Sequence, residues 1–352
     1  MTRSLVALVA LLALLATACG GGAGPGGTSS SPTQAAAGSA SPTTRPCCTK
    51  VTAAYSNISA DDWIPWYAFE KGIFKDNGLD VDLQSINGGA QTSAALLSGG
   101  IQIGQFGGSE ALSANAGGAD LVIVANLAPV YPYKLYVKKG ITSLADLKNK
   151  TPKAVVGVSN AGGSSDIATR AALKAAGIDP DKDVDIRAVG SHANRTAALL
   201  NGSIDAGVDD PPEDLELVKA GLTALIDLAG QKLPAANTGV IMQRTFVSAN
   251  KDTVQAYIDS LTIARVRMKA DKAGAVAVLG KYFKLDNQEA LNAAYDFFMN
   301  EVTVPYLYPE VVQFKDAVDI LGKGNPNIAK VDISKMIDRS FMQSAQDRKL
   351  GG

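Results

Sequence analysis

Short apolar runs alternate along this 352-residue chain with longer segments whose apolar residues recur at helical spacing. The short runs are typical of strands, and the longer segments are typical of helices with one buried face. Several helical segments end at a glycine, as at Gly72 and Gly177, because glycine readily adopts the left-handed conformation that closes a helix. The alternation predicts α/β layers. Strands are expected at 51–55, 79–83, 101–106, 121–127, 134–137, 154–158, 184–189, 205–208 and 224–228, and helices at 63–71, 90–98, 109–116, 165–176 and 195–200, with short helices opening at 143 and 211.

The pattern changes after a last strand at 238–244. The segments that follow all have helical spacing, with no strand between them, at 252–269, 273–283, 289–300, 310–321 and 334–345. We interpret this order as two α/β lobes with a helical tail that packs largely on lobe one. The chain is expected to leave lobe one near Tyr133 and to return near Gly239. Lobe one then comprises 50–133 and 239–352, and lobe two comprises 134–238.

The first 49 residues have the composition of an export and anchoring segment. Arg3 precedes an apolar run at 5–15, and small residues at 16–18 follow, which predicts a secretory signal peptide over 1–18. The segment before Cys19 resembles a bacterial lipobox, although Ala16 stands where leucine is commoner. Two acyl chains on Cys19 would hold the protein on a membrane. The Gly/Ser/Thr/Pro-rich segment 19–49 is expected to be a flexible tether, so the protein should be anchored to the outer face of the cytoplasmic membrane.

The composition excludes several function classes. The net charge is −1 and charged residues make up 19% of the chain, so there is no basic patch for nucleic acid. His192 is the only histidine, which leaves hydrolytic triads and histidine-based metal sites poorly supplied. We expect His192 in a surface loop, and we assign Cys47 and Cys48 no catalytic role. The sequence therefore predicts no cofactor, no metal and no enzymatic activity.

Four segments in the same order resemble the sulfonate-, taurine- and nitrate-type substrate-binding proteins, a group related to thiamine-pyrimidine synthases. The segments are WIP at 63–65 with AFEKGIF at 68–74 and GLDV at 78–81, then ALLSG at 95–99, GITSLADLK at 140–148, and AAL at 197–199 with GSIDA at 202–206. Gln102 stands where the family often has Asp, and Asn149 stands where it often has Gly.

The resemblance implies a two-lobed type II periplasmic-binding-protein fold. Such a fold has two mixed sheets with helices on both faces and a helical C-terminal tail. It further implies a monomer that closes over a small-molecule solute and docks on the permease of an ABC importer, whose ATPase lies across the membrane. In open α/β sheets, ligands bind beyond the carboxyl ends of the strands, so the cleft should lie where two such edges face each other.

Loops and helix starts that follow strands supply the candidate ligand-binding residues. Glycine- and serine-rich helix starts offer free N–H groups to an acidic group, and aromatic side chains could brace an organic body. The candidates are Asn57, Trp63, Tyr67, Gly107, Gly108, Ser109, Tyr131, Gly162, Gly163, Ser164, Ser165, Arg195 and Asp209.

Several of these candidates have a structural alternative. Trp63 and Tyr67 could equally be half-buried packing residues, Ser109 could be a helix cap, and Arg195 could be solvated. Asp209 and Asp210 would suit an amine-bearing or hydroxylated ligand. We expect an organic acid, a sulfonate or a carboxylate, in preference to nitrate. The alternatives are an enzyme of the thiamine-pyrimidine type on the same fold, or a transporter component that binds a pyrimidine or a flavin precursor.

Overall fold

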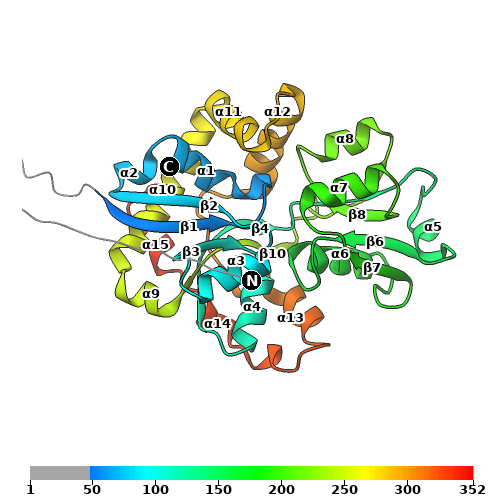
Figure 1. Cartoon of the computed structure of the whole chain (residues 1–352), viewed down its shortest axis with the longest axis horizontal. Helices are drawn as coiled ribbons and strands as arrows, with labels where there is room; N and C mark the ends of the chain where they lie inside the picture. Colours follow the sequence, from blue (N-terminus) through cyan, green and yellow to red (C-terminus); the bar gives the residue numbers. More distant parts are fainter. Residues whose placement is uncertain (1–47, 352) are drawn as a thin grey trace, which may run out of the picture. The chain divides into compact units, whose positions relative to one another are not determined.

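Two five-stranded sheets with helices around them account for the described part of the chain, residues 48–351 of a computed structural model (Figure 1). The predicted signal peptide, the lipid site at Cys19, Cys47 and almost all of the predicted tether lie outside the described residues. Both sheets contain parallel and antiparallel pairs. The predicted fold class, two mixed sheets in an α/β arrangement with a helical C-terminal region, is confirmed.

The first sheet has the order β2-β1-β3-β10-β4. β1 pairs in parallel with β2 and with β3, whereas β10 lies antiparallel between β3 and β4. The residues of β4 from Leu121 to Ala128 are all buried, as expected for a strand covered on both faces. The strands are β1 Thr49–Tyr55, β2 Leu79–Ser85, β3 Ile103–Phe106, β4 Leu121–Val130 and β10 Pro234–Gln243.

The second sheet has the order β7-β6-β8-β5-β9, with β6 parallel to β7 and β8, and β5 antiparallel to β8 and β9. We call this sheet with α5–α8 lobe two, and the rest of the described chain lobe one. The chain returns to the first sheet through β10, where Pro234 already pairs with Val130 of β4. The strands are β5 Lys134–Val137, β6 Ala154–Val158, β7 Val184–Ala188, β8 Ala206–Asp209 and β9 Thr223–Asp227.

Helices flank both sheets (Figure 1). Those of lobe two are α5 Leu144–Asn149, α6 Ser164–Ala175, α7 His192–Leu200 and α8 Asp214–Lys219. Those of lobe one are α1 Trp63–Glu70, α2 Ile73–Asp76, α3 Gly89–Leu97, α4 Gly108–Ala116, α9 Arg244–Ala249, α10 Lys251–Ala270, α11 Lys272–Phe283, α12 Gln288–Phe297, α13 Lys315–Leu321, α14 Ile333–Met336 and α15 Ser340–Asp347. Shorter 3-10 turns occur at Ala60–Asp62, Val311–Phe314 and Ile328–Lys330, and a π-helical turn at Phe298–Val302.

The C-terminal helices differ from the predicted ones where a tertiary contact interrupts the helix. The segment predicted as one helix over 334–345 is two helices, α14 and α15. Between them Ile337 forms a β-bridge with Ile123 of β4, and the Asp338 N–H donates to the Ile123 carbonyl at 2.9 Å. This bridge extends the edge of the first sheet, so sheet pairing overrides the helical period here.

The tail is held to lobe one by packing and by a charged pair. α10 packs on α1, and α15 packs on α10 and β4. The Arg348 guanidinium donates to both carboxylate oxygens of Asp259, each at 2.6 Å, and bidentate geometry of this kind fixes orientation as well as position. Over residues 48–351, no helix has the length and apolarity required to span a bilayer.

Candidate functional site

A polar cavity lies where the carboxyl ends of strands from both sheets face each other. Its lining comes from the segments after β1, β3 and β6, from the starts of α3, α6 and α7, and from β10. The cavity volume is ≈ 40 Å³, which is room for about three water molecules, so a solute enters only when the lobes move apart. The lining residues are Ser56, Asn57, Ser59, Asp61, Gly89, Gly107, Glu110, Tyr133, Ser159, Asn160, Ser164, Ser165, His192, Arg195, Asn237 and Thr238.

Asp61 is the central acidic residue on the lobe-one side. It lies in the turn between β1 and α1 and is 8% exposed. Its Oδ2 atom accepts hydrogen bonds from Asn237 Nδ2 at 2.9 Å and from the Thr238 hydroxyl, both on β10. The side-chain oxygen of Asn237, Oδ1, is buried and has no hydrogen-bond partner among the described residues. This corner of the cavity therefore has more acceptors than donors.

Glu110 is the second lobe-one carboxylate, and glycines from both lobes make room for it. A Cβ atom on Gly89 would lie 2.4 Å from Glu110 Oε1, one on Gly107 would lie 2.1 Å from Oε2, and one on Gly163 of lobe two would lie 2.8 Å from Oε1. The Ser109 hydroxyl donates to Oε2 at 2.8 Å. Burial raises the pKa of Glu110, although hydrogen bonds from Ser109, its own backbone and Asn160 oppose the shift.

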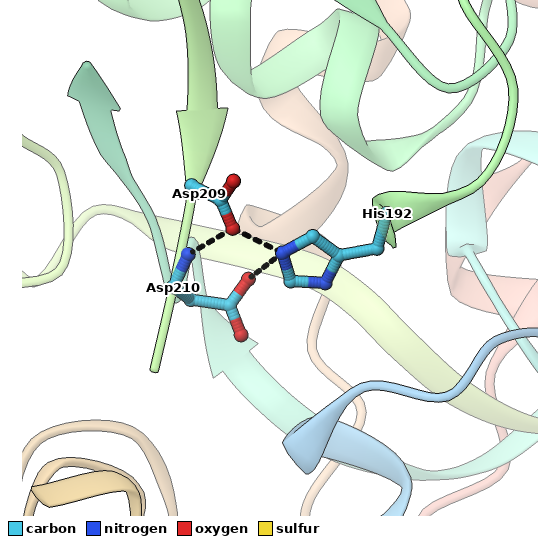
Figure 2. A group of neighbouring side chains, drawn as sticks. All are labelled: His192, Asp209 and Asp210. Atoms are coloured by element: carbon cyan, nitrogen blue, oxygen red, sulfur yellow. Dashed lines mark hydrogen bonds and ion pairs between the residues drawn. The ribbon is translucent and has the colours of Figure 1, made fainter. Parts of the chain in front are cut away.

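Lobe two presents two cationic side chains from α7. Arg195 is 2% exposed, and its Nε donates to the Val208 carbonyl while Nη1 donates to the Ser159 hydroxyl at 2.8 Å. The His192 imidazole points at the carboxylates of Asp209 and Asp210 at the end of β8 (Figure 2). Its Nε2 bonds Asp209 Oδ1 and lies 3.5 Å from Asp210 Oδ1. Both cations are thus already engaged inside lobe two.

The carboxylates around His192 decide its charge. Burial alone would lower its pKa, but Asp209, Glu213 and Asp210 outweigh burial and raise the pKa to about 10, so the ring is an imidazolium at neutral pH. The pKa of Asp209 is lowered despite its burial, because His192, Arg195 and Thr196 stabilise the carboxylate. Burial and nearby carboxylates raise the pKa of Asp210 well above its usual value, although His192 opposes the shift, and neither Asp210 oxygen accepts a hydrogen bond from the described residues.

His192, Asp209 and Asp210 are also a candidate metal-binding group, since one donor atom of each lies within 4.8 Å of the others. Nitrogen and oxygen donors of this kind suit Zn²⁺ and similar cations. The Nε2 atom, however, bonds Asp209, and a protonated imidazole nitrogen cannot ligate a cation. The arrangement is therefore that of a buried ion pair whose charges balance one another.

Some of the predicted residues line the cavity and others do not. Five of them do: Asn57, Gly107, Ser164, Ser165 and Arg195. Others lie directly behind the lining. Ser109 donates to Glu110, Gly163 borders the Glu110 carboxylate, and Asp209 holds His192. Gly108 instead faces Ala236 and Phe314, and Gly162 is a turn residue with a φ of +75°.

The three predicted aromatic braces lie elsewhere, which corrects that part of the prediction. Trp63 is 1% exposed, donates from Nε1 to the Ala275 carbonyl at 3.0 Å and meets the Tyr295 ring edge to face. The Tyr67 hydroxyl donates to Asp271 at 3.2 Å, and that of Tyr131 donates to Asp316 at 3.3 Å. Trp63 and Tyr67 pack lobe one because α10–α12 cover the face of α1 that the sequence alone leaves unpartnered, and Tyr131 is bonded to α13.

The prediction of His192 as a surface-loop residue is wrong. It opens α7, is 5% exposed and lines the cavity, because the buried carboxylates of β8 attract it. Asp61, Glu110 and Asn160 were also missed, although they lie in strand-following segments that already contained candidates. Asn237 and Thr238 carried no sequence signal, since their place at the cavity depends on the pairing of β10.

Comparisons with known proteins agree with this geometry. A family model described as NMT1/THI5 like matches residues 63–270. The chain is 24% identical over 338 residues to the riboflavin-binding protein RibY of Chloroflexus aurantiacus, covering 90% of this chain and 92% of RibY.

Among solved structures, the aliphatic sulphonate binding protein SsuA of Escherichia coli superposes with a TM-score of 0.67 at 23% identity, covering 82% of this chain and 92% of SsuA. The nitrate-binding protein NrtA of Synechocystis superposes with a TM-score of 0.70 at 16% identity, covering 86% of this chain and 89% of NrtA. At these identities the structural matches establish a shared fold.

The position of Trp63 leads to a stability prediction. We expect Trp63→Ala to lower the free energy of unfolding by about 3–5 kcal/mol, because it removes a buried indole and leaves a cavity. The measurement is urea unfolding followed by circular dichroism. Phe69→Ala on the same helix is the control. Because Phe69 is 41% exposed, this variant should lose far less unfolding free energy. Equal losses in the two variants would contradict the core placement of Trp63.

The carboxyl of Glu213 leads to a pH prediction. Burial, partly offset by His192, raises its pKa from 4.5 to about 7. The folded state then holds this proton more tightly than the unfolded state, so the stabilisation from this group is fully present below pH 4.5 and is lost as the pH rises through about 7. Glu213→Gln removes this loss and should gain stability relative to the parent between pH 5 and pH 8. Unfolding curves across this range test it, with exposed Glu216→Gln as control. A constant difference between Glu213→Gln and the parent would refute the assignment.

Proposed function

This chain belongs to the NMT1/THI5-like family, and we propose that it is the extracytoplasmic solute-binding protein of an ABC importer. In this role it captures a small polar solute between its lobes and delivers it to the permease. The observation that carries the proposal is the buried polar cavity built from strand ends of two separate sheets. RibY, SsuA and NrtA, which share the sequence pattern or the fold, are all binding proteins by name.

The connections between the lobes suit an opening motion. Two segments link the sheets, the short stretch from β4 to β5 and the stretch from β9 into β10. One contact across the cavity is the hydrogen bond from the Ser164 hydroxyl to the Asn237 carbonyl at 2.9 Å. A solute that contacts both lobes would favour the closed arrangement by its differential affinity for it. Closure would then report the presence of solute to the permease.

The lining supports a small solute with an acidic group. The start of α6 offers the N–H groups of its first turn and the Ser165 hydroxyl, and Arg195 adds positive charge beside them. Tyr133 is the aromatic residue of the lining, which leaves little surface for stacking a broad ring system. A carboxylate or sulfonate on a short organic body fits these features, as expected from the sequence.

We further propose that the chain is exported and held on the membrane by lipid on Cys19. The small residues before Cys19 and the Gly/Ser-rich segment after it support this. Cys19→Ala should shift the protein from the membrane fraction to the soluble extracytoplasmic fraction, because the thiol that accepts the lipid is lost. Cell fractionation with mass spectrometry of the N-terminal peptide is the measurement, and Cys47→Ala is the control. Membrane retention of the Cys19→Ala protein would overturn lipid anchoring.

Solute capture is tested by binding measurements on the mature chain. A panel of small sulfonates, carboxylates, amino acids, amines, nitrate and polyols is screened by thermal shift, followed by calorimetry on any hit. A solute at 100 times its Kd should add about 2.7 kcal/mol of stability. The proposal fails if no solute of the panel stabilises the chain.

Gly107→Ala tests whether binding requires closure of this cavity. The new Cβ would lie 2.4 Å from the Ser164 hydroxyl of lobe two and 2.1 Å from Glu110, so it keeps the lobes apart. We expect a loss of affinity of at least about tenfold, equivalent to 1.4 kcal/mol. Gly100→Ala is the control, since that exposed position meets only ordinary contacts. Unchanged affinity in Gly107→Ala would place capture somewhere other than this cavity.

A further inference from the structure

Two ion pairs run between the lobes, outside the solute cavity. Lys219 Nζ of α8 lies 2.9 Å from Glu289 Oε2 of α12. Lys323 Nζ, just after α13, lies 3.2 Å from Asp181 Oδ2, in the segment between α6 and β7. Figure 1 shows α8 and α12 at the top of the view and α13 near the bottom. The pairs therefore join the lobes on opposite sides of the molecule, and they exist only while the lobes are close together.

The charges of the first pair stand at helix ends that suit them. Lys219 is the last residue of α8, and Glu289 lies in the first turn of α12. A helix favours a cation at its C-terminus and an anion at its N-terminus, because its peptide dipoles add up along the axis. Each charge is thus well placed on its own lobe, and closure of the lobes brings the two helix ends together.

Asp181 is positioned for its partner inside lobe two. Arg170 of α6 donates from Nη1 to Asp181 Oδ1 and from Nε to Asp166 Oδ1, both at 2.6 Å. Asp166 Oδ2 also accepts a hydrogen bond from the Gly162 N–H at 2.8 Å. Lys323 reaches the other oxygen of Asp181, Oδ2. Because lobe two already holds Asp181 in place, little side-chain freedom remains to be lost when Lys323 pairs with it.

The end of α13 also makes an apolar contact with lobe two. α13 packs on α6, and a Cβ atom on Gly162 would lie 3.2 Å from Leu321 Cδ2. Two residues further on, Ser164 lines the solute cavity and donates to the Asn237 carbonyl of lobe one. Leu321 and Lys323 thus contact lobe two directly behind one wall of the cavity.

Each of these ion pairs is weak on its own. The side chains of Lys323 and Asp181 are 60% and 51% exposed, and those of Lys219 and Glu289 are 51% and 70% exposed. One exposed pair changes an equilibrium by at most about fivefold. Two pairs together can shift the balance between open and closed lobes by roughly tenfold. They bias closure without locking it.

We propose that these two ion pairs form a latch that favours the closed arrangement of the lobes before any solute arrives. The described arrangement is the closed one, since the cavity between the lobes is only ≈ 40 Å³ in volume. A captured solute adds its own contacts to those of the latch. The inference goes beyond the proposed function, because it concerns the balance between lobe arrangements and holds whichever solute is captured.

Small-angle X-ray scattering of the mature chain without added solute tests the latch. At 0.1 M sodium chloride the radius of gyration should match the described arrangement, and it should rise as the salt is increased to 1 M. The physical reason is that the screening length falls from about 10 Å to about 3 Å over this range. A radius of gyration that does not change with salt, whether its value is closed or open, would overturn the latch.

Charge reversal assigns the effect to the named residues. Lys219→Glu and Lys323→Glu in one chain should open the lobes at 0.1 M salt, since each new carboxylate faces Glu289 or Asp181. The closed fraction should fall by at least about tenfold relative to the parent. Adding Glu289→Lys should recover part of the closed fraction, because it forms the first pair again with the charges exchanged.

The matched control is Lys315→Glu with Lys335→Glu. It changes the net charge by the same amount, but these lysines pair with Asp319 and Asp332 inside lobe one, so the lobes should stay closed. Circular dichroism and melting curves show that each variant is folded. A double reversal that stays closed, or a control that opens as far, would refute the role of Lys219 and Lys323.

Discussion

The cavity depends on the antiparallel insertion of β10 between β3 and β4. This one strand completes the first sheet, carries the chain back from lobe two and brings Asn237 and Thr238 to Asp61. Its early part is held by β4. Pro234 pairs with Val130, and the Ala235 carbonyl accepts a hydrogen bond from Asn126 at 2.8 Å. A strand with these constraints places its polar residues at the junction of the lobes with little freedom.

The sequence predicted the local elements well because their signals are local. The strands at 134–137 and 154–158 have the predicted bounds, and the short helix expected to open at 143 does so, with Ser143 and Asp146 forming a reciprocal pair of capping hydrogen bonds. Failures occurred where a distant partner decides the outcome. The pairing of Ile337 with Ile123 splits one predicted helix, and the covering helices α10–α12 turn Trp63 into a core residue.

The site residues that could be predicted from the sequence are those in segments directly after strands. Asn57, Gly107, Ser164, Ser165 and Arg195 were found by that rule, and Asp61 and Asn160 lie in the same loops. His192 could not be placed, because its burial results from a cluster of carboxylates that come together only in the folded lobe. The balance of charge inside the cavity is likewise a tertiary property. The net charge of −1 does not show that several carboxyl groups gather around His192.

The glycines around Glu110 have a mechanical consequence. Gly107 and Gly163 belong to different lobes, yet both touch the same carboxyl group, which the Ser109 hydroxyl holds in place. Glu110 therefore lies as a spacer between the lobes in this arrangement. In the proposed role, such a stop would give the closed form one width, which a permease could recognise by a single geometry. Solutes too long for that width would hold the lobes open and fail to be recognised, which makes the spacer a length filter as well as a contact.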